Sequence, residues 1–302
     1  MMSKPPSELV LALRTALVAA APDSAPVHLF ALVDGALLLD LPKRAQQAWP
    51  ASQALSLLTG ATGAGAAEVG PLLFALSQEQ VDAGLPDTLL DVKTGRSAGS
   101  FLVSSQSLSG LATCLARFVD VKLDDDSTMV MRFFDPRVLP FWLDMVQPGY
   151  TAHLAASASS WLYWDAQLAL CSVGLHASNT PGAAATFPVR VSPEAEQKLL
   201  DDCYPFTLIE RFRKEDANAL ERVPVKDRYT FFRDQLARAR GHGVQSNGEI
   251  EAYCGLALEL GPRFDEDSAM RPVLLKVKAG EKLLEALASV EDDDWARLKG
   301  HA

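Results

Sequence analysis

The residues with the clearest catalytic spacing form the string Gly95-Arg96-Ser97-Ala98-Gly99, which matches the G-x-S-x-G pattern of a nucleophile elbow. In a serine hydrolase such a serine attacks an acyl carbon, a histidine accepts its proton and a carboxylate orients that histidine. Asp135 together with His153, His176 or His242 would supply these partners in the hydrolase chain order. The sequence therefore contains the residue types that acyl transfer needs.

The residues that follow this serine do not favour an elbow. The serine of an elbow lies on a sharp turn between a strand and a helix, and that turn exposes its hydroxyl. After Gly99 the sequence continues with an apolar run that predicts a strand, and no HGGG-type loop is present to supply oxyanion donors. We therefore keep a serine hydrolase that uses Ser97 as an alternative and expect that the protein is not an enzyme.

Two further patterns could bind a cofactor or a metal. Gly63-Ala64-Gly65 follows an apolar segment, as a dinucleotide loop does, but Glu68 stands where the third glycine belongs and Gly70-Pro71 prevents the helix that should follow. The acidic triplets 124–126 and 292–294 lack the spaced carboxylates of a calcium loop, so both predict solvated turns. We expect neither a cofactor nor a metal ion.

The composition restricts the partners. With 28 Lys and Arg against 38 Asp and Glu, the formal net charge is −10, and no basic block is present to neutralise phosphates. Nucleic acid and anionic membrane surfaces are therefore poor partners. No apolar run approaches the ~20 residues of a membrane-spanning helix, and the four cysteines form no C-x-x-C pair. These features predict a cytoplasmic protein without integral membrane association.

The first part of the chain predicts an N-terminal helix or extension over residues 1–26, followed by an α/β lobe over residues 27–180 with a mixed sheet and flanking helices. In the N-terminal helix, Ser7 is the expected N-cap and leucines recur on one face. Ser107 is expected to cap a later helix of this lobe. Apolar or alternating runs predict the strands at residues 27–33, 54–58, 72–76, 101–104, 128–134 and 160–170.

The last part of the chain, residues 187–302, predicts a mainly α-helical lobe after a short strand at 187–191. Ser192-Pro193-Glu194 combines an N-cap, a proline at the first helical position and an acid in the first turn. Ser246 and Glu249 fit a capping box. Besides the helix that begins at Ser192, helices are expected at about 206–221, 226–239, 247–260 and 280–289.

The most distinctive string is MRFFDPRVL at residues 131–139. It predicts a strand that leads into a helix, with Asp135 as the N-cap and Pro136 as the first helical residue. Arg132 and Arg137 lie close enough in sequence to pair with Asp135, or to neutralise carboxylates of a partner.

At these residues the chain resembles the bacterial type VI secretion adaptors, also called effector chaperones, a family long catalogued as a domain of unknown function. The resemblance covers about residues 27–170, and LGPRFD within residues 255–267 is similar to the helical tail of such proteins. The strings that carry it are FALVDGA at 30–36, EVGPLLFAL at 68–76, the helix within 104–121 and MRFFDPRVL.

The resemblance implies an adaptor in the bacterial cytoplasm that binds a cognate toxic effector and helps load it onto the spike protein, without enzyme activity. Aromatic and arginine side chains most often dominate interface energy. The candidate partner-binding residues are therefore Arg132, Phe134, Asp135, Arg137, Trp161 and Trp164. The aromatics have a second interpretation, namely that they fill the α/β core. Besides the serine hydrolase, a structural subunit of the secretion apparatus is an alternative function.

Overall fold

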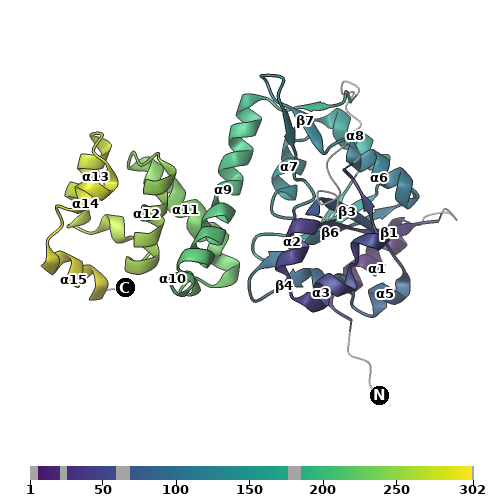
Figure 1. Ribbon diagram of the computed structural model, residues 1–302, viewed down its shortest axis with the longest axis horizontal. Helices are drawn as coiled ribbons and strands as arrows, with labels where there is room; N and C mark the ends of the chain where they lie inside the picture. The colour runs from purple at the N-terminus through teal and green to yellow at the C-terminus, as the bar shows by residue number, and fades with distance from the viewer. Residues whose placement is uncertain (1–5, 21–25, 59–68, 176–184, 301–302) are drawn as a thin grey trace, which may run out of the picture. The chain divides into compact units, whose positions relative to one another are not determined.

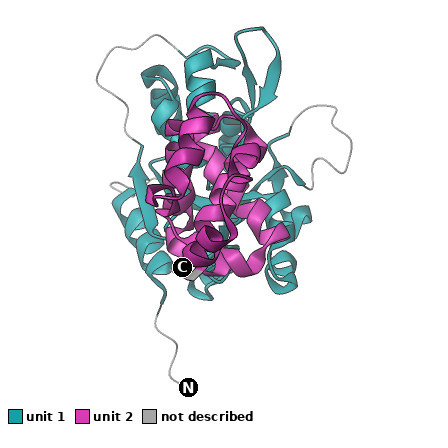
Figure 2. Cartoon of the chain, turned by 90° about the vertical axis from the view of Figure 1, so that its left-hand side faces the viewer, with its two compact units in different colours: residues 1–199 teal, residues 200–302 magenta. Residues whose placement is uncertain are grey.

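The chain folds into two compact units, residues 1–199 and 200–302, which Figure 2 shows in different colours. The computed structural model describes residues 6–20, 26–58, 69–175 and 185–300. An α/β unit followed by a mainly helical unit agrees with the predicted fold class. The division between the units lies inside helix α9 (Pro193–Glu215), which is later in the chain than the segment 180–187 where the sequence placed the change.

A six-stranded sheet forms the centre of the first unit, with strand order β10-β9-β6-β1-β3-β2 and antiparallel pairing throughout. Figure 1 labels three of these strands, β1, β3 and β6. Its strands are β1 (His28–Asp34), β2 (Leu55–Ser56), β3 (Pro71–Leu76), β6 (Gly99–Ser104), β9 (Ser160–Trp164) and β10 (Leu170–Gly174). A smaller sheet has the order β11-β7-β8, in which β11 (Val189–Arg190) runs parallel to β7 (Asp120–Lys122) and β8 (Thr128–Val130) runs antiparallel to it. The strands β4 (Leu90–Asp91) and β5 (Arg96–Ser97) pair with each other.

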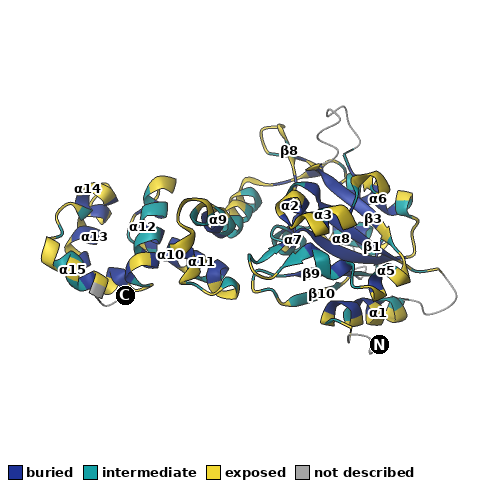
Figure 3. Cartoon of the chain, turned by 60° about the horizontal axis from the view of Figure 1, so that its bottom comes forward, coloured by how far each residue is buried: buried dark blue, intermediate teal, exposed yellow. Residues whose placement is uncertain are grey.

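Both faces of the six-stranded sheet are covered by helices. Alternate residues of a strand point to opposite faces, so β1 places Phe30 and Leu32 in one buried cluster and Leu29, Ala31 and Val33 in the other. This is why the sequence of β1 is apolar without interruption, as expected for a strand with two covered faces. The dark blue ribbon of the sheet in Figure 3 shows the same burial.

The helices of the first unit divide between these two faces. Side chains of α6, α7 and α8 belong to the cluster of Phe30, and side chains of α1, α2, α3 and α5 belong to the cluster of Leu29. Ser7 and Ser107 cap α1 and α6 as predicted, since their hydroxyls accept from Val10 N and Gly110 N. The helices are α1 (Glu8–Ala20), α2 (Gly35–Asp40), α3 (Lys43–Ala48), α5 (Gln78–Asp82), α6 (Leu108–Ala116), α7 (Leu139–Met145) and α8 (Pro148–Ala155), with 3-10 turns at Ala51–Gln53 and Pro86–Leu89.

The second unit consists of helices. They are the larger part of α9, α10 (Ala217–Glu221), α11 (Arg228–Gly241), α12 (Asn247–Leu260), α13 (Met270–Lys278), α14 (Leu283–Leu287) and α15 (Asp292–Gly300), with 3-10 turns at Val225–Asp227 and Phe264–Glu266. The predicted helix at 206–221 is wrong in its start, because α9 continues through the buried Pro205 from Pro193 to Glu215. The acidic triplet 292–294 is not a solvated turn but the first turn of α15, where the helix dipole favours negative charge.

A buried carboxylate holds the helices of the second unit together. The side chain of Asp265, 1% exposed, accepts hydrogen bonds from Arg238 of α11 and Tyr253 of α12, and lies 3.0 Å from Nε2 of His242. The carboxylate of Asp265 therefore connects α11, α12 and the turn that follows α12 through a single negative charge. Removing one partner of such a buried pair leaves the other charge uncompensated.

We expect Asp265→Asn to lower the free energy of unfolding of the second unit by roughly 3 kcal/mol, because it leaves Arg238 without its main counter-charge. The measurement is the denaturant midpoint of the unit. Asp234→Asn is the matched control, since Asp234 pairs with Arg233 at the surface, where both side chains are more than half exposed. Equal midpoints for the two variants would contradict the assignment.

The loss of stability caused by Asp265→Asn should depend on pH. Burial raises the pKa of Asp265, but the hydrogen bonds from Arg238, Tyr253 and His242 outweigh it and hold that pKa below its usual value of 3.8. A carboxyl with a lower pKa in the folded state stabilises the fold above its unfolded pKa and loses that contribution as the pH falls. The difference in unfolding free energy between wild type and Asp265→Asn should therefore be full near about pH 6 and shrink below about pH 4.

Candidate functional site

The candidate site is a cluster of two buried carboxylates and two arginines at the end of β1. Asp34 is the last residue of β1 and is 0% exposed. Its Oδ1 accepts from the backbone N–H groups of Ala36 and Leu37, so Asp34 is also the N-cap of α2. This position fixes the carboxylate at the point where a central strand becomes a helix.

Arg132 brings a positive charge to this carboxylate from a distant part of the chain. Its Nη2 donates to Oδ2 of Asp34 across a sequence separation of 98 residues, and the same nitrogen lies 3.8 Å from Oδ2 of Asp135. The guanidinium also lies 5.7 Å from the centre of the Phe134 ring. The Arg132 side chain nevertheless remains 46% exposed, so it lies partly at the surface.

Asp135 organises the turn between β8 and α7 rather than capping α7. Its Oδ1 accepts from the backbone N–H of Arg137, and its carboxylate receives Nε and Nη2 of the same arginine at 3.0 and 2.7 Å. The backbone N–H groups of Val138 and Leu139 both donate to the carbonyl of Asp135.

Two predictions for the string at 131–139 are therefore wrong in detail. The strand ends at Val130, because residues 133–138 form turns, and the helix begins at Leu139 instead of Pro136. The N-cap of α7 is Val138, and no side chain caps it. The expected pairing of Arg132 and Arg137 with Asp135 is present.

The two buried carboxylates of the cluster attract the guanidinium groups of Arg132 and Arg137 and so hold them in position. Burial raises the pKa of Asp34, against the lowering effect of Arg132. Asp135, 3% exposed, is also buried, whereas the side chains of Arg132 and Arg137 are 46% and 24% exposed. Arginine presents its N–H donors in a planar fork that matches carboxylates and carbonyls. Chemically, the cluster can hold two oriented guanidinium groups near the surface.

The aromatic candidates lie in the core and not at the surface. Phe134 is 4% exposed, and Trp161 is 0% exposed with its Nε1 donating to Ser100 Oγ at 2.9 Å. Trp164 lies on the other face of the sheet, edge-on to Phe101. Phe134 therefore joins Arg132, Asp135 and Arg137 in the cluster, while the two tryptophans fill the core on opposite faces of β9.

Asp34 is the member of the cluster that sequence reasoning missed. The apolar run predicts a strand over residues 27–33 that ends before Asp34, and the sequence indicates no partner for the Asp34 side chain. A signal was available, because a carboxylate placed directly after five apolar residues, 29–33, in a doubly covered strand must find a counter-charge. The sequence alone does not say that this counter-charge comes from Arg132.

Ser97 does not have the geometry of a nucleophile elbow. It is the last residue of β5, and Ala98 alone separates it from the start of β6, so a strand follows it and not a helix. Its hydroxyl donates to the carbonyl of Gly99 at 3.0 Å, and the residue is 7% exposed. His176, one of the possible partners, and the loop Gly63-Ala64-Gly65 lie outside the described residues.

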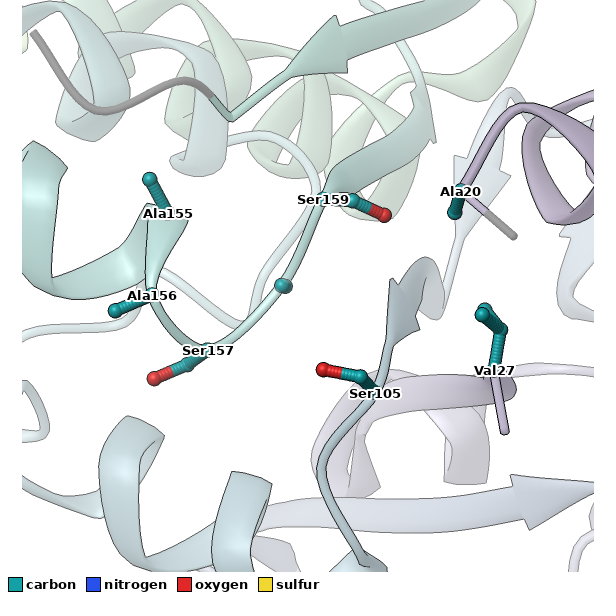
Figure 4. A pocket seen from close by; sticks show the side chains of 8 residues that line it. Ala20, Val27, Ser105, Ala155, Ala156, Ser157 and Ser159 are labelled. Atoms are coloured by element: carbon teal, nitrogen blue, oxygen red, sulfur yellow. The ribbon is translucent and has the colours of Figure 1, made fainter. Parts of the chain in front are cut away.

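A cavity of about 100 Å³ lies among Ala20, Val27, Ser105 and residues 155–159 (Figure 4). Its lining contains no titratable side chain, and the hydroxyls of Ser157 and Ser159 donate to the carbonyls of His153 and Val103. Across the parts of the chain that the structure describes, His, Cys, Asp and Glu side chains form no group of three that could hold a metal ion. Nor is any described helix long and apolar enough to cross a bilayer.

Comparison with known proteins gives one match. Residues 29–153 match a family described as a domain of unknown function, DUF4123. This range contains Asp34, Arg132, Asp135 and Arg137, and it ends within α8. No curated protein and no solved structure matches the chain.

We expect Asp135→Ala to lower the free energy of unfolding by about 3 kcal/mol, because it removes the buried carboxylate that binds the Arg137 guanidinium and accepts the backbone N–H that shapes the turn. The measurement is chemical denaturation followed by tryptophan fluorescence. Asp82→Ala serves as the control: Asp82 also pairs with an arginine, Arg14, but both side chains are more than 40% exposed. Similar losses in both variants would show that Asp135 has no special structural role.

Proposed function

We propose that this protein is an adaptor that binds a cognate toxic effector in the bacterial cytoplasm and helps load it onto the spike protein of a type VI secretion system. The observation that carries the proposal is the cluster of Asp34, Arg132, Asp135 and Arg137. Arg132, Asp135 and Arg137 lie in the string MRFFDPRVL and Asp34 lies in FALVDGA, two strings that resemble that adaptor family. All four residues are within the range that matches the domain of unknown function.

The geometry of this cluster supports a role in protein binding. Buried carboxylates hold Arg132 and Arg137 in fixed orientations, so little side-chain entropy remains to be lost when a partner binds. Arginine is among the residues that most often dominate interface energy. A partner with a carboxylate or an exposed carbonyl opposite these guanidinium groups would gain charge-assisted hydrogen bonds.

Two other functions remain as alternatives. A serine hydrolase would need Ser97 as a nucleophile, and the strand position and hydrogen bond of that serine do not support it. A structural subunit of the secretion apparatus would bind the spike or other apparatus proteins without an effector. The two experiments below distinguish these possibilities.

Co-expression with the effector encoded beside its gene should yield a stable complex that elutes together from size-exclusion chromatography. Arg132→Lys keeps the charge that compensates Asp34 but removes the guanidinium fork, so it should weaken the complex by roughly tenfold while leaving the fold intact. The matched control is Arg14→Lys, at an exposed pair with Asp82 on α1. A well-folded protein that binds neither the effector nor the spike would contradict the proposal, and binding to the spike alone would favour the structural subunit.

A fluorophosphonate probe should leave Ser97 unlabelled, because the hydroxyl is buried and donates to the Gly99 carbonyl. The measurement is intact mass after incubation with the probe, with Ser97→Ala as the comparison. Stoichiometric labelling of the wild type that the variant abolishes would favour the hydrolase over the adaptor.

A further inference from the structure

The strand β10 forms one edge of the six-stranded sheet, and no strand of the described residues pairs with its outer side (Figure 3). Leu175 N donates to Ser159 O, and Asp165 N donates to Ala169 O. In an antiparallel pair the residues that bond to the partner alternate with residues whose N–H and C=O point away. Ser172 and Gly174 therefore direct their main-chain donors and acceptors outward, and both residues are exposed.

Within its described residues 170–174, β10 has no charged side chain, no proline and no bulge. Natural edge strands are commonly protected by charged side chains, by proline or by a bulge. The sequence of β10 is Leu-Cys-Ser-Val-Gly, and its register with β9 runs without interruption from Leu170 to Gly174. A further strand could pair with it without displacing any charge.

A cavity of about 380 Å³ lies beside the same edge. Leu143 of α7, Leu154 of α8, Tyr163 of β9 and Val173 of β10 are among the residues that line it. Val173 pairs with Trp161 across the strands, so it points to the face of the sheet that α7 and α8 cover. Every second side chain of an added strand would point to this face, where a cavity lined by both apolar and polar side chains is available.

The charges around this cavity are acidic. Among the described residues that line it, Asp144 is the charged one. Asp165 begins the turn from β9 to β10 and accepts from the backbone N–H groups of Gln167 and Ala169. Burial, and after it the neighbouring Cys171, Asp165 and Asp144, raise the pKa of Tyr163 to about 12. The carboxylates of Asp144 and Asp165 therefore lie close enough to Tyr163, which lines the cavity, to raise its pKa.

We propose that β10 and this cavity receive an extended segment of a partner protein, which adds a strand to the sheet, places apolar side chains in the cavity and carries Lys or Arg beside Asp144 and Asp165. Main-chain bonds to an open edge and pockets for alternate side chains are the two elements of β-strand addition. A second copy of this chain is a poorer occupant, because the net charge of −10 and the acidic rim would oppose like charges. The inference rests on the proposed function, in which the partner is the effector.

The test compares Ser172→Pro with Ser172→Ala in the complex with the effector encoded beside the gene. Proline at 172 removes an outward N–H and obstructs an added strand, but it spares the bonds to β9. Alanine keeps the N–H. We expect Ser172→Pro to raise the dissociation constant at least about tenfold, which corresponds to about 1.4 kcal/mol, while Ser172→Ala binds like the wild type. Circular dichroism and the thermal midpoint establish that both variants are folded.

Two further measurements do not depend on the proline variant. Hydrogen exchange in the wild-type complex should show new protection of residues 170–175, because the outward N–H groups become bonded. Asp144→Lys, a change at an exposed position, should weaken the complex and reduce its sensitivity to salt.

The outcomes separate this inference from the proposed function. A wild-type complex without protection of residues 170–175, together with equal binding by Ser172→Pro, overturns the inference and leaves the adaptor function standing. A wild-type protein that binds neither effector nor spike overturns the adaptor function itself. A dimer of this chain that Ser172→Pro abolishes, with effector binding unchanged, overturns the inference in favour of self-pairing.

Discussion

The structure of the first unit depends on the neutralisation of one carboxylate. Asp34 ends a strand that helices cover on both faces, and its side chain has no access to water. A charge in that position is very costly unless a counter-charge and hydrogen-bond donors reach it. Arg132 and the first N–H groups of α2 meet that need. Because Arg132 must reach the end of β1, the path of the segment before α7 is fixed as well.

Several other features follow from that fixed path. Asp135 turns the chain three residues after Arg132, and Phe133 is held against Trp142 of α7, with ring centres 4.8 Å apart. Trp142 in turn packs edge-on to Trp161 of β9, the strand next to the open edge. A chain of buried contacts thus connects the arginine cluster to the sheet edge beside α7. The two surfaces proposed for partner binding are therefore connected through the buried core of the first unit.

Much of this fold could be predicted from the sequence, because local signals and burial agreed there. The apolar run of β1, the Ser107 cap and the start of α9 at Ser192-Pro193 each have a local cause. The errors occurred where a distant residue decides the outcome. Asp135 has the sequence of an N-cap, but Arg137 occupies its carboxylate, and Pro205 suggests a helix end that packing overrides. The partner of Asp34 is 98 residues away, and no local pattern could indicate it.

The double coverage of the central sheet also has an evolutionary consequence. Substitutions in β1 or β6 disturb packing on one face or the other, so these strands can diverge little without loss of stability. The open side of β10 is different, because its outward groups are main-chain atoms, which every residue except proline supplies in full. Ser172 and Gly174, both exposed, can be exchanged while that bonding capacity persists. A scaffold of this kind can change its surface sequence while its buried architecture stays constant.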